Sequence, residues 1–536
     1  MRLPAISIAA MSCALFLTGC ATAAPPMAHL NAKPVSGGEL TISITSDPVD
    51  WDPSFNGRSN TALSYESLLG FKTGPDIGLT EVILQPALAE RWEVSPDART
   101  FTFYLRKGVK FADVSPVNGR EMTSADVKWT MDYRTRTGDI KDKKLPVDQL
   151  AFMFEGMNSV ETPDPYTAVI SFKEPFLPFI NYAGSQWNPI LPREIYEQDG
   201  HLRDQIVGTG PYILDHSNIQ KGTRWSFIKN RNYWGEGKPY IDSIRQFVIP
   251  DEATRFAAFQ TKQLDVLDNL AYPAFKQVTQ ASPNVETFKY FAVQSSFIFL
   301  SQAKGGPLTD VRVRRAIGMG VDRDELNRVV AGGEGQWALP GVMPGLFTET
   351  EVKQHVKQDI EQAKQLMQQA GYGNGIKLVW SIASNDSQAN MTIYQLIQAQ
   401  LKRIGVEVVL NPMDPTDRTT KRRNGDFELD FSTSATGSLT MDLDSWVYGR
   451  YHGYSTGNYT KANDPELNML LEASRREIDP AKRLELQRKA SLRIYEMGWS
   501  ANLIYEPIYA VWHSRVHDYF PWFSDKAPYR QSWIQS

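Results

Sequence analysis

Two carboxylates two positions apart are the residues whose types and spacing point most directly to chemistry. Asp442 and Asp444 lie on either side of Leu443, and Trp446 and Tyr448 follow them. Paired carboxylates can act as acid and base on a glycosidic bond when their carboxyl groups lie roughly 5–10 Å apart across a cleft. The chain contains no GxxxxGKS or GxxxxGKT motif. The sequence therefore favours binding over catalysis for this pair.

Metal ligation is the second candidate chemistry. Of the seven histidines, only His513 and His517 are four residues apart, and no HExxH motif occurs. We predict that they lie on a surface strand or turn and bind no metal. The only cysteines, Cys13 and Cys20, lie in the first twenty residues, so no soft-metal site is expected in the rest of the chain. Neither a metal nor a cofactor is expected.

The first residues have the pattern of an export signal. One arginine precedes a small and apolar run at 6–17, which is too short to span a bilayer because roughly 20 apolar residues are needed. Residues 17–20, LTGC, resemble the bacterial lipobox, which implies cleavage before Cys20 and lipid attachment to its sulfur. We predict a signal peptide at 1–19 and a flexible tether at 20–37. The alternative is an ordinary secretory signal cut after Ala23.

Composition narrows the class of protein. A chain of 536 residues suggests roughly three or four domains. The 57 basic and 61 acidic residues nearly balance, so no nucleic-acid partner is expected. Aromatic residues make up 11% of the chain, which suits either a large core or a site that grips a ligand.

Strand and helix patterns alternate along the chain and indicate an α/β fold. Alternating apolar residues predict strands at 39–44 and 100–105, and a helix begins at Ser124. Residues 376–411 predict a strand, a helix and a second strand, which together form a parallel βαβ unit. Ligands collect beyond the carboxyl ends of such strands, where the loop with Ser384 and Asn385 lies. Alternatively, this loop only caps the helix.

A second helix is predicted at 359–370. The glycines at 371, 373 and 375 follow this helix rather than a strand, so they indicate a helix end and a turn, not a phosphate loop.

Six motifs resemble the peptide/nickel class of bacterial solute-binding proteins, which serve ABC importers. They occur in the order of that family over nearly all of residues 39–515. The motifs are LAERWEVSPD (88–97), TFTFYLRKGVKF (100–111), TSADV (123–127), VGTGPY (207–212), KNRNYWGEGKPYID (229–242) and DVRVRRAIGMGVDR (310–323).

These motifs have structural interpretations of their own. Residues 208–211, GTGP, predict a tight turn, because glycine accepts a positive φ and proline fixes the next φ. Arg106 is expected to hydrogen-bond to a strand edge, and Trp234 and Tyr240 are expected to seal a core.

The resemblance implies a fold like that of type II periplasmic binding proteins: two α/β lobes, joined by hinge strands, with an inserted third domain. Lobe I would comprise 38–56, 201–290 and 506–536, the inserted domain 57–200, and lobe II 291–505. The hinge strands would cross near 294–297 and 503–506.

The resemblance also implies the function. The protein would be a monomeric binding subunit that captures short peptides or peptide-like solutes and delivers them to a membrane permease. It would itself catalyse no reaction. It would lie in the periplasm or on the outer face of the cell membrane, anchored through Cys20.

The ligand is expected in a cleft between the lobes. In peptide binders of the family an Asp in lobe II holds the peptide amine, but the position expected for it falls at 439–441, LTM, so Asp442 or Asp444 would have to substitute. The candidate ligand-binding residues are Trp187, Trp337, Ser384, Asn385, Asp442, Asp444, Trp446, Tyr448 and Tyr505.

This departure leaves other ligands and other functions open. Within the family, the alternatives are an oligosaccharide, an opine-like conjugate, and a nickel or other metal chelate. Outside transport, they are a secreted hydrolase that uses Asp442 or Asp444 and a sensor lipoprotein that has kept the fold.

Overall fold

The structure is a computed structural model. It describes residues 33–535 apart from 49, 55–60, 75, 78–81, 142, 147, 149, 292–294, 342–345, 433–441, 456 and 522–527. The predicted signal peptide, Cys20 and most of the predicted tether lie outside the described residues. Every helix in the described part of the chain is too short or too polar to cross a bilayer.

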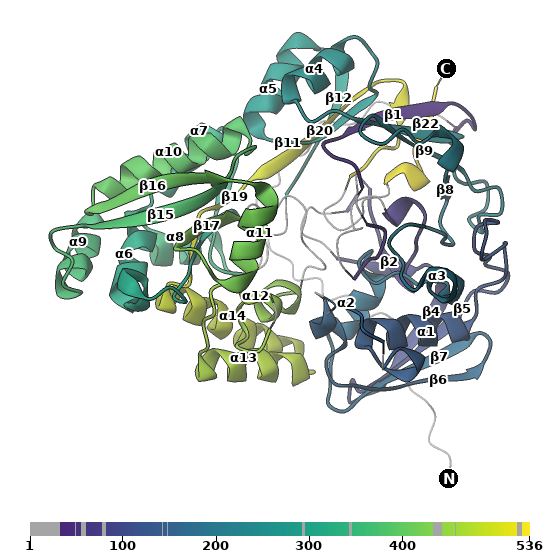
Figure 1. Ribbon diagram of the computed structural model, residues 1–536, viewed down its shortest axis with the longest axis horizontal. Helices are drawn as coiled ribbons and strands as arrows, with labels where there is room; N and C mark the ends of the chain where they lie inside the picture. The colour runs from purple at the N-terminus through teal and green to yellow at the C-terminus, as the bar shows by residue number, and fades with distance from the viewer. Residues whose placement is uncertain are drawn as a thin grey trace. The chain divides into compact units, whose positions relative to one another are not determined.

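Two sheets combine strands that are distant in the chain. The first has the order β1-β10-β9-β8, with β1 parallel to β10 and the other neighbours antiparallel. The second has the order β11-β20-β12, in which β20, yellow in Figure 1, returns from the end of the chain to lie between two earlier strands. The elements are β1 (Glu39–Ile44), β8 (Tyr212–Leu214), β9 (Arg224–Lys229), β10 (Ser243–Val248), α4 (Glu252–Gln260), β11 (Val266–Leu270), α5 (Tyr272–Ala281), β12 (Val285–Phe291) and β20 (Pro507–His513).

A third sheet lies in the segment predicted as the inserted domain. Its order is β4-β5-β7-β6, all antiparallel. The predicted strand at 100–105 is confirmed, and its alternate side chains Phe101, Phe103 and Leu105 are buried. The elements are β4 (Ala89–Val94), β5 (Thr100–Leu105), α1 (Ser124–Thr135), β6 (Met157–Asp164), β7 (Thr167–Phe172), α2 (Phe179–Gly184) and α3 (Arg193–Asp199).

A fourth sheet, of order β16-β15-β17-β13-β18, confirms the predicted βαβ unit. Strands β15 and β16 are parallel and are joined by α10, which buries Ile393, Ile397 and Leu401. The elements are β13 (Phe297–Leu300), α6 (Val311–Gly320), α7 (Arg323–Ala331), α9 (Ile360–Gln369), β15 (Ile376–Ala383), α10 (Gln388–Lys402), β16 (Val406–Met413), α11 (Pro415–Asn424), β17 (Leu429–Ser432) and β18 (Ser500–Asn502). Figure 1 shows α7 and α10 beside β15 and β16.

The helix predicted at 359–370 is α9, for which Asp359 is the N-cap and Ala370 the C-cap. The next residues form the predicted turn, with positive φ at Gly371 and Gly375.

The remaining elements connect these sheets. They are α8 (Glu349–Val356), α12 (Gly449–Tyr451), α13 (Pro465–Arg476), α14 (Pro480–Met497), β2 (Leu69–Phe71), β3 (Leu84–Pro86), β14 (Gln336–Trp337), β19 (Ile504–Tyr505), β21 (Val516–His517), β22 (Trp533–Ile534), the 3-10 turns η1 (Thr61–Leu63), η2 (Gly138–Ile140), η3 (Ala151–Phe154), η4 (His216–Asn218), η5 (Gly306–Thr309) and η7 (Pro528–Arg530), and the π-helical turn η6 (Asp444–Tyr448).

The chain passes between the second and the fourth sheet twice. It leaves β12 for β13 and later leaves β18 for β20 by way of β19. The two crossings are bonded to each other, because Ser296 N donates to Ile504 O (2.9 Å) and Leu503 N donates to Ser296 O (2.9 Å). Each sheet takes its strands from a single predicted domain. The division into lobes remains a prediction, because residues 35–536 form one compact unit.

One predicted turn has a different physical basis. Gly208 and Gly210 do not have positive φ. Instead, a Cβ at Gly208 would lie 2.0 Å from the Ser64 carbonyl oxygen, and one at Gly210 would lie 2.7 Å from it. Gly210 N donates to that oxygen at 2.8 Å. Glycine is needed here for close backbone approach, so the expectation of a positive φ was wrong.

Three other motif expectations can be compared with the structure. Arg106 Nε donates to Ala87 O (3.3 Å), which lies between β3 and β4 and not on the expected strand edge. Trp234 and Tyr240 are both half-buried, and Trp234 packs against the core from its surface. His513 and His517 lie on strands as predicted, but His517 is buried and stacks on Trp533, with centroids 3.9 Å apart.

Candidate functional site

Aromatic side chains from four parts of the chain form one buried group, which we call the aromatic cluster: Phe71, Phe297, Trp446, Tyr448 and Tyr505. Trp446 and Phe297 meet edge to face, with centroids 5.5 Å apart. Three of the predicted ligand-binding residues, Trp446, Tyr448 and Tyr505, thus come together. Flat rings with large apolar area are suited to gripping a small solute.

The two carboxylates beside this cluster are bonded within the protein. Arg475 Nε donates to Asp444 Oδ1 (2.6 Å), and Tyr182 Oη donates to Asp444 Oδ2 (2.5 Å). Arg483 Nη2 lies 2.6 Å from Asp442 Oδ2. Both aspartates are buried. Because buried charges need such partners, each aspartate has its charge matched inside the fold.

Tyr448 lies between two flat groups. The Arg475 guanidinium carbon is 3.1 Å from the centroid of its ring, and the His452 ring stacks 4.2 Å away. Burial raises the pKa of Tyr448 well above its usual value. Burial, followed by the Asp444 charge, likewise raises the pKa of Tyr182, so its hydroxyl stays protonated and donates.

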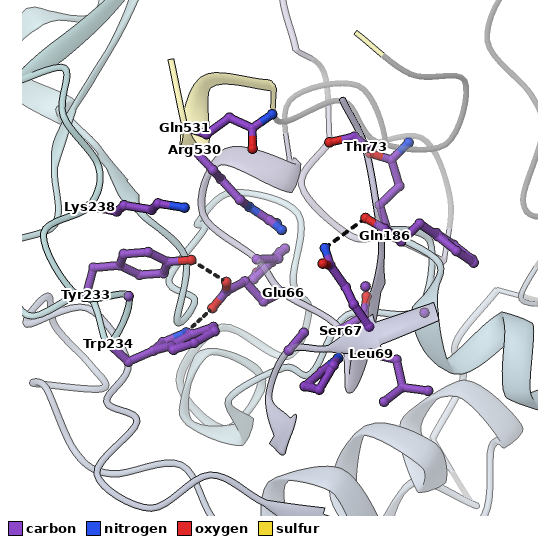
Figure 2. A pocket seen from close by; sticks show the side chains of 18 of the residues that line it. Glu66, Ser67, Leu69, Thr73, Gln186, Tyr233, Trp234, Lys238, Arg530 and Gln531 are labelled. Atoms are coloured by element: carbon purple, nitrogen blue, oxygen red, sulfur yellow. Dashed lines mark hydrogen bonds between the residues drawn. The ribbon is translucent and has the colours of Figure 1, made fainter. Parts of the chain in front are cut away.

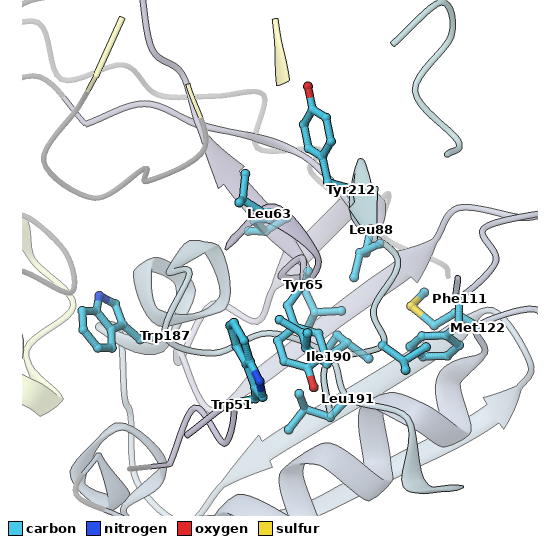
Figure 3. Close-up of a cluster of buried hydrophobic side chains, with 14 of the residues drawn as sticks. Trp51, Leu63, Tyr65, Leu88, Phe111, Met122, Trp187, Ile190, Leu191 and Tyr212 are labelled. Carbon is cyan, nitrogen blue, oxygen red and sulfur yellow. The ribbon is translucent and has the colours of Figure 1, made fainter. Parts of the chain in front are cut away.

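The other predicted residues are placed differently. Trp337 pairs with Ile504 in the β14–β19 ladder, next to Tyr505, and donates its Nε1 to Asp324 (3.1 Å). Trp187 is buried at the edge of the core drawn in Figure 3, and its carbonyl accepts from Arg134 Nη1 (2.8 Å). Ser384 and Asn385 are exposed just after β15.

A cavity of about 300 Å³ lies beside the segment that carries Glu66. Figure 2 shows Glu66 among the lining residues, with Tyr233, Trp234 and Lys238 on one side of it and Arg530 above it. Glu66 is buried and accepts hydrogen bonds from Tyr233 Oη (2.9 Å), Trp234 Nε1 (2.8 Å) and Thr209 Oγ1 (2.9 Å).

One residue connects the cavity to the aromatic cluster. Phe71, at the end of β2, lines the cavity and packs in the cluster. The two features therefore share a ring. Together they form the candidate binding region of the described residues.

Sequence reasoning missed several residues of this region. Glu66, Arg475, Arg483 and Tyr182 were not singled out, because each acts through a partner that is distant in the chain. A usable signal existed for Glu66 alone, because Tyr233 and Trp234 belong to a motif already noted and both bond to it. Within the described residues, no three His, Cys, Asp or Glu side chains are grouped so that they could hold a metal ion.

The chain is similar in sequence to known bacterial binding proteins. Heme-binding protein A of Haemophilus influenzae is 25% identical over 498 residues, covering 88% of each chain. The dipeptide-binding protein of Escherichia coli is 26% identical over 507 residues, covering 89% of this chain and 92% of the relative.

The fold is that of solved periplasmic binding proteins. A periplasmic binding protein of Helicobacter pylori associated with an ABC transporter, in complex with the peptide STSA, superposes with a TM-score of 0.81 at 24% identity over 94% of this chain and 99% of that one. Residues 84–458 match the bacterial extracellular solute-binding proteins, family 5 Middle. The predicted class of protein and its type II fold are thereby confirmed: the chain belongs to the family 5 bacterial extracellular solute-binding proteins.

Proposed function

We propose that this chain is the binding subunit of an ABC importer and captures a short peptide or a peptide-like solute. The observation that carries the proposal is the candidate binding region, in which Phe71 of the predicted inserted domain meets Trp446, Tyr448 and Tyr505 of predicted lobe II. The Escherichia coli relative named as a dipeptide-binding protein supports the solute class.

The proposed mechanism is capture by closure. Solute enters while the lobes are apart, and the lobes rotate about the paired crossings at Ser296 and Leu503. Closure is driven only by contacts that the solute gains in the closed form. A membrane permease receives the closed complex, and other subunits hydrolyse ATP. The chain leaves the solute chemically unchanged.

Within the site, Trp446 and Tyr505 are proposed to stack on the solute, and Tyr448 to border it. Trp187, Trp337, Ser384 and Asn385 remain candidates for further contacts. Asp442 and Asp444 would reach a cationic group of the solute only by exchanging the bonds that they make to Arg483 and Arg475.

That requirement favours a second candidate solute, an amino-acid conjugate or blocked peptide without a free amine. A free amine would need an unmatched carboxylate, and both predicted carboxylates are matched inside the fold. The two candidates differ in one chemical group and can be separated directly.

Native mass spectrometry of gently purified protein identifies the solute that it carries. Calorimetry with the dipeptide Met-Leu and with N-acetyl-Met-Leu then tests the amine. Stronger binding of Met-Leu supports a peptide with a free amine, whereas stronger binding of the acetylated form supports the conjugate. A carried oligosaccharide or metal chelate, or solute that emerges cleaved, contradicts the proposal.

A matched pair of variants tests the site. We expect Trp446→Ala to weaken binding of the identified solute at least tenfold, about 1.4 kcal/mol, because a central stacked ring is lost. Trp92→Ala, in β4, is the control and should leave affinity unchanged. Equal affinities in the two variants would remove Trp446 from the site.

We also propose export and a lipid anchor on Cys20. Mass spectrometry of the amino-terminal peptide should find a lipid on Cys20, and Cys20→Ala should move the protein out of the membrane fraction. An amino terminus beginning after Ala23 would instead indicate an ordinary secretory signal. A monomer is expected by size-exclusion chromatography with light scattering. Permease and ATPase genes beside the coding gene would argue against a sensor.

A further inference from the structure

Arg475, near the end of α13, has all three guanidinium nitrogens bonded. Its Nε donates to Asp444 Oδ1 (2.6 Å), and its Nη2 donates to Asp444 Oδ2 (3.1 Å) and to Phe152 O (3.0 Å). Its Nη1 donates to Glu155 Oε2 at 2.5 Å. A planar guanidinium bonded on three sides has its orientation fixed.

These bonds join two separate parts of the sequence. Asp444 and Arg475 belong to predicted lobe II, whereas Phe152 and Glu155 lie in and just after η3 of the predicted inserted domain. Tyr182 of α2, also in the inserted domain, adds its bond to Asp444. Arg475 and Asp444 are thus the centre of a bonded bridge between the two parts.

Arg475 bonds to two carboxylates, and we call these two contacts the Asp444 arm and the Glu155 arm of the bridge. The two carboxylates differ in their exposure to water. The side chain of Asp444 is 3% exposed, whereas that of Glu155 is 53% exposed. Removing the Asp444 arm would leave a buried charge without its partner, which is costly. Breaking the Glu155 arm returns a half-exposed carboxylate to water, which costs little. The bond between Arg475 and Asp444, which both belong to predicted lobe II, is therefore permanent. Of the bonds that cross to the inserted domain, the one to Glu155 is the one whose carboxylate already reaches water, so it is the easiest to release.

The permanent arm also organises the aromatic cluster. Asp444 begins the π-helical turn η6, which carries Trp446 and Tyr448. The guanidinium of Arg475 lies against the Tyr448 ring, a favourable cation–π contact. The residue that bridges the two parts therefore also holds the rings proposed to meet the solute.

We propose that Arg475 is a positioning residue for solute capture. It fixes η6 through Asp444, and its contact with Glu155 is the releasable bond that favours closure of the inserted domain over η6. This inference rests on the proposed function. If the bond forms only in the closed form, losing it lowers the closed population, and the apparent Kd rises in proportion.

The test uses variants at the releasable arm, where the fold is least at risk. Because the chain has no cysteine after Cys20, Lys173→Cys and Lys482→Cys provide two labelling sites, one in each part. Single-molecule energy transfer then measures the distance between them in the solute-free protein. Glu155→Gln should lengthen it, whereas Arg476→Gln, at the exposed neighbour that pairs with Glu472, should not.

Affinity gives the second measurement. Glu155→Gln should raise the Kd for Met-Leu about two- to fivefold, the range that a half-exposed ion pair can supply, with an unchanged melting temperature. Arg475→Lys should restore part of the effect of Arg475→Met, because a lysine can still reach one carboxylate. If Arg475 served stability alone, Arg475→Met would lower the melting temperature and leave the distance distribution of the folded protein unchanged.

The outcomes separate the inference from the proposed function. Unchanged distances in Glu155→Gln, with normal binding of Met-Leu, would overturn the inference and leave the proposed function intact. Longer distances in a protein that binds neither Met-Leu nor any carried solute would overturn the proposed function, while the bridge itself would stand.

Discussion

Two arginines in this molecule make similar bonds in different surroundings. Arg134, on α1, bonds to Asp148 and to the carbonyl of Trp187, and the side chains of Arg134 and Asp148 are 0% and 1% exposed. All of these residues belong to the predicted inserted domain. Arg475 bonds to a buried carboxylate on its own side and to a half-exposed one across the bridge.

The difference shows how burial separates a structural ion pair from one that can open. When both partners are buried, neither can be hydrated without unfolding, so the pair behaves as part of the core. When one partner reaches water, the pair can break while both sides stay folded. Arg134 therefore serves stability, and Arg475 can serve both stability and motion.

The largest expected effect concerns the fully buried pair. Arg134→Met should lower the free energy of unfolding by about 3–5 kcal/mol, because Asp148 keeps a buried charge without its partner. Urea denaturation measures the loss. Arg193→Met, which removes an exposed pair with Glu197, is the control and should cost less than about 0.5 kcal/mol. Similar losses in both variants would contradict the comparison.

The buried arm of the bridge should give the next largest effect. Asp444→Asn keeps the shape of the side chain but removes its charge, so the free energy of unfolding should fall by about 1–3 kcal/mol. Solute affinity should fall as well, because η6 loses its tie to Arg475. Asp426→Asn, in an exposed pair with Lys304, should change neither. Normal stability in Asp444→Asn would mean that the charge of Arg475 is compensated elsewhere.

Salt should act on one arginine and not on the other. Raising the salt concentration from 0.05 M to 0.5 M screens the half-exposed Glu155 contact, so the solute-free protein should open slightly, with an effect below about 1 kcal/mol. Energy transfer between the two labelled positions reads the change. Glu155→Gln should be insensitive to salt in this measurement, and a salt response of equal size in that variant would show that another contact is screened.

The smallest effect is expected at a surface pair, where Arg488 contacts Glu351. Hydrogen bonds from Arg488 and then from Thr348 lower the pKa of Glu351 from 4.5 to about 2. Because the folded-state pKa is depressed, this stabilisation is complete above about pH 4.5 and is lost as the pH falls towards 2. The melting temperatures of the parent and Glu351→Gln should therefore converge over that range. Arg488→Gln should reduce this dependence without abolishing it, because Thr348 still donates to Glu351. A difference between the parent and Glu351→Gln that stays constant with pH would contradict the prediction.

The periodicity of apolar residues predicted those elements of the fold that depend on neighbouring residues in the sequence. The unit of β15, α10 and β16 follows from alternation and helical spacing within a few dozen residues, and the structure has these elements in the predicted order. The glycines at 208 and 210 were noticed for the wrong reason, because their constraint is the backbone of Ser64, which no local pattern reveals.

The candidate site was predicted only in part for the same reason. The closely spaced Asp442 and Asp444, and the aromatic residues after them, stand out in the sequence. Their partners do not, since Arg475 meets Glu155 from 320 positions away. Nor does the sequence reveal that the carbonyl of Trp187, a candidate ligand-binding residue, accepts from the distant and buried Arg134.

Phe71 has a consequence for the length of solute that the protein can accept. Its ring borders both the cavity above Glu66 and the aromatic cluster. A smaller residue at this position would lengthen the cavity towards the aromatic cluster, so variants at Phe71 should differ in the length of solute that they accept.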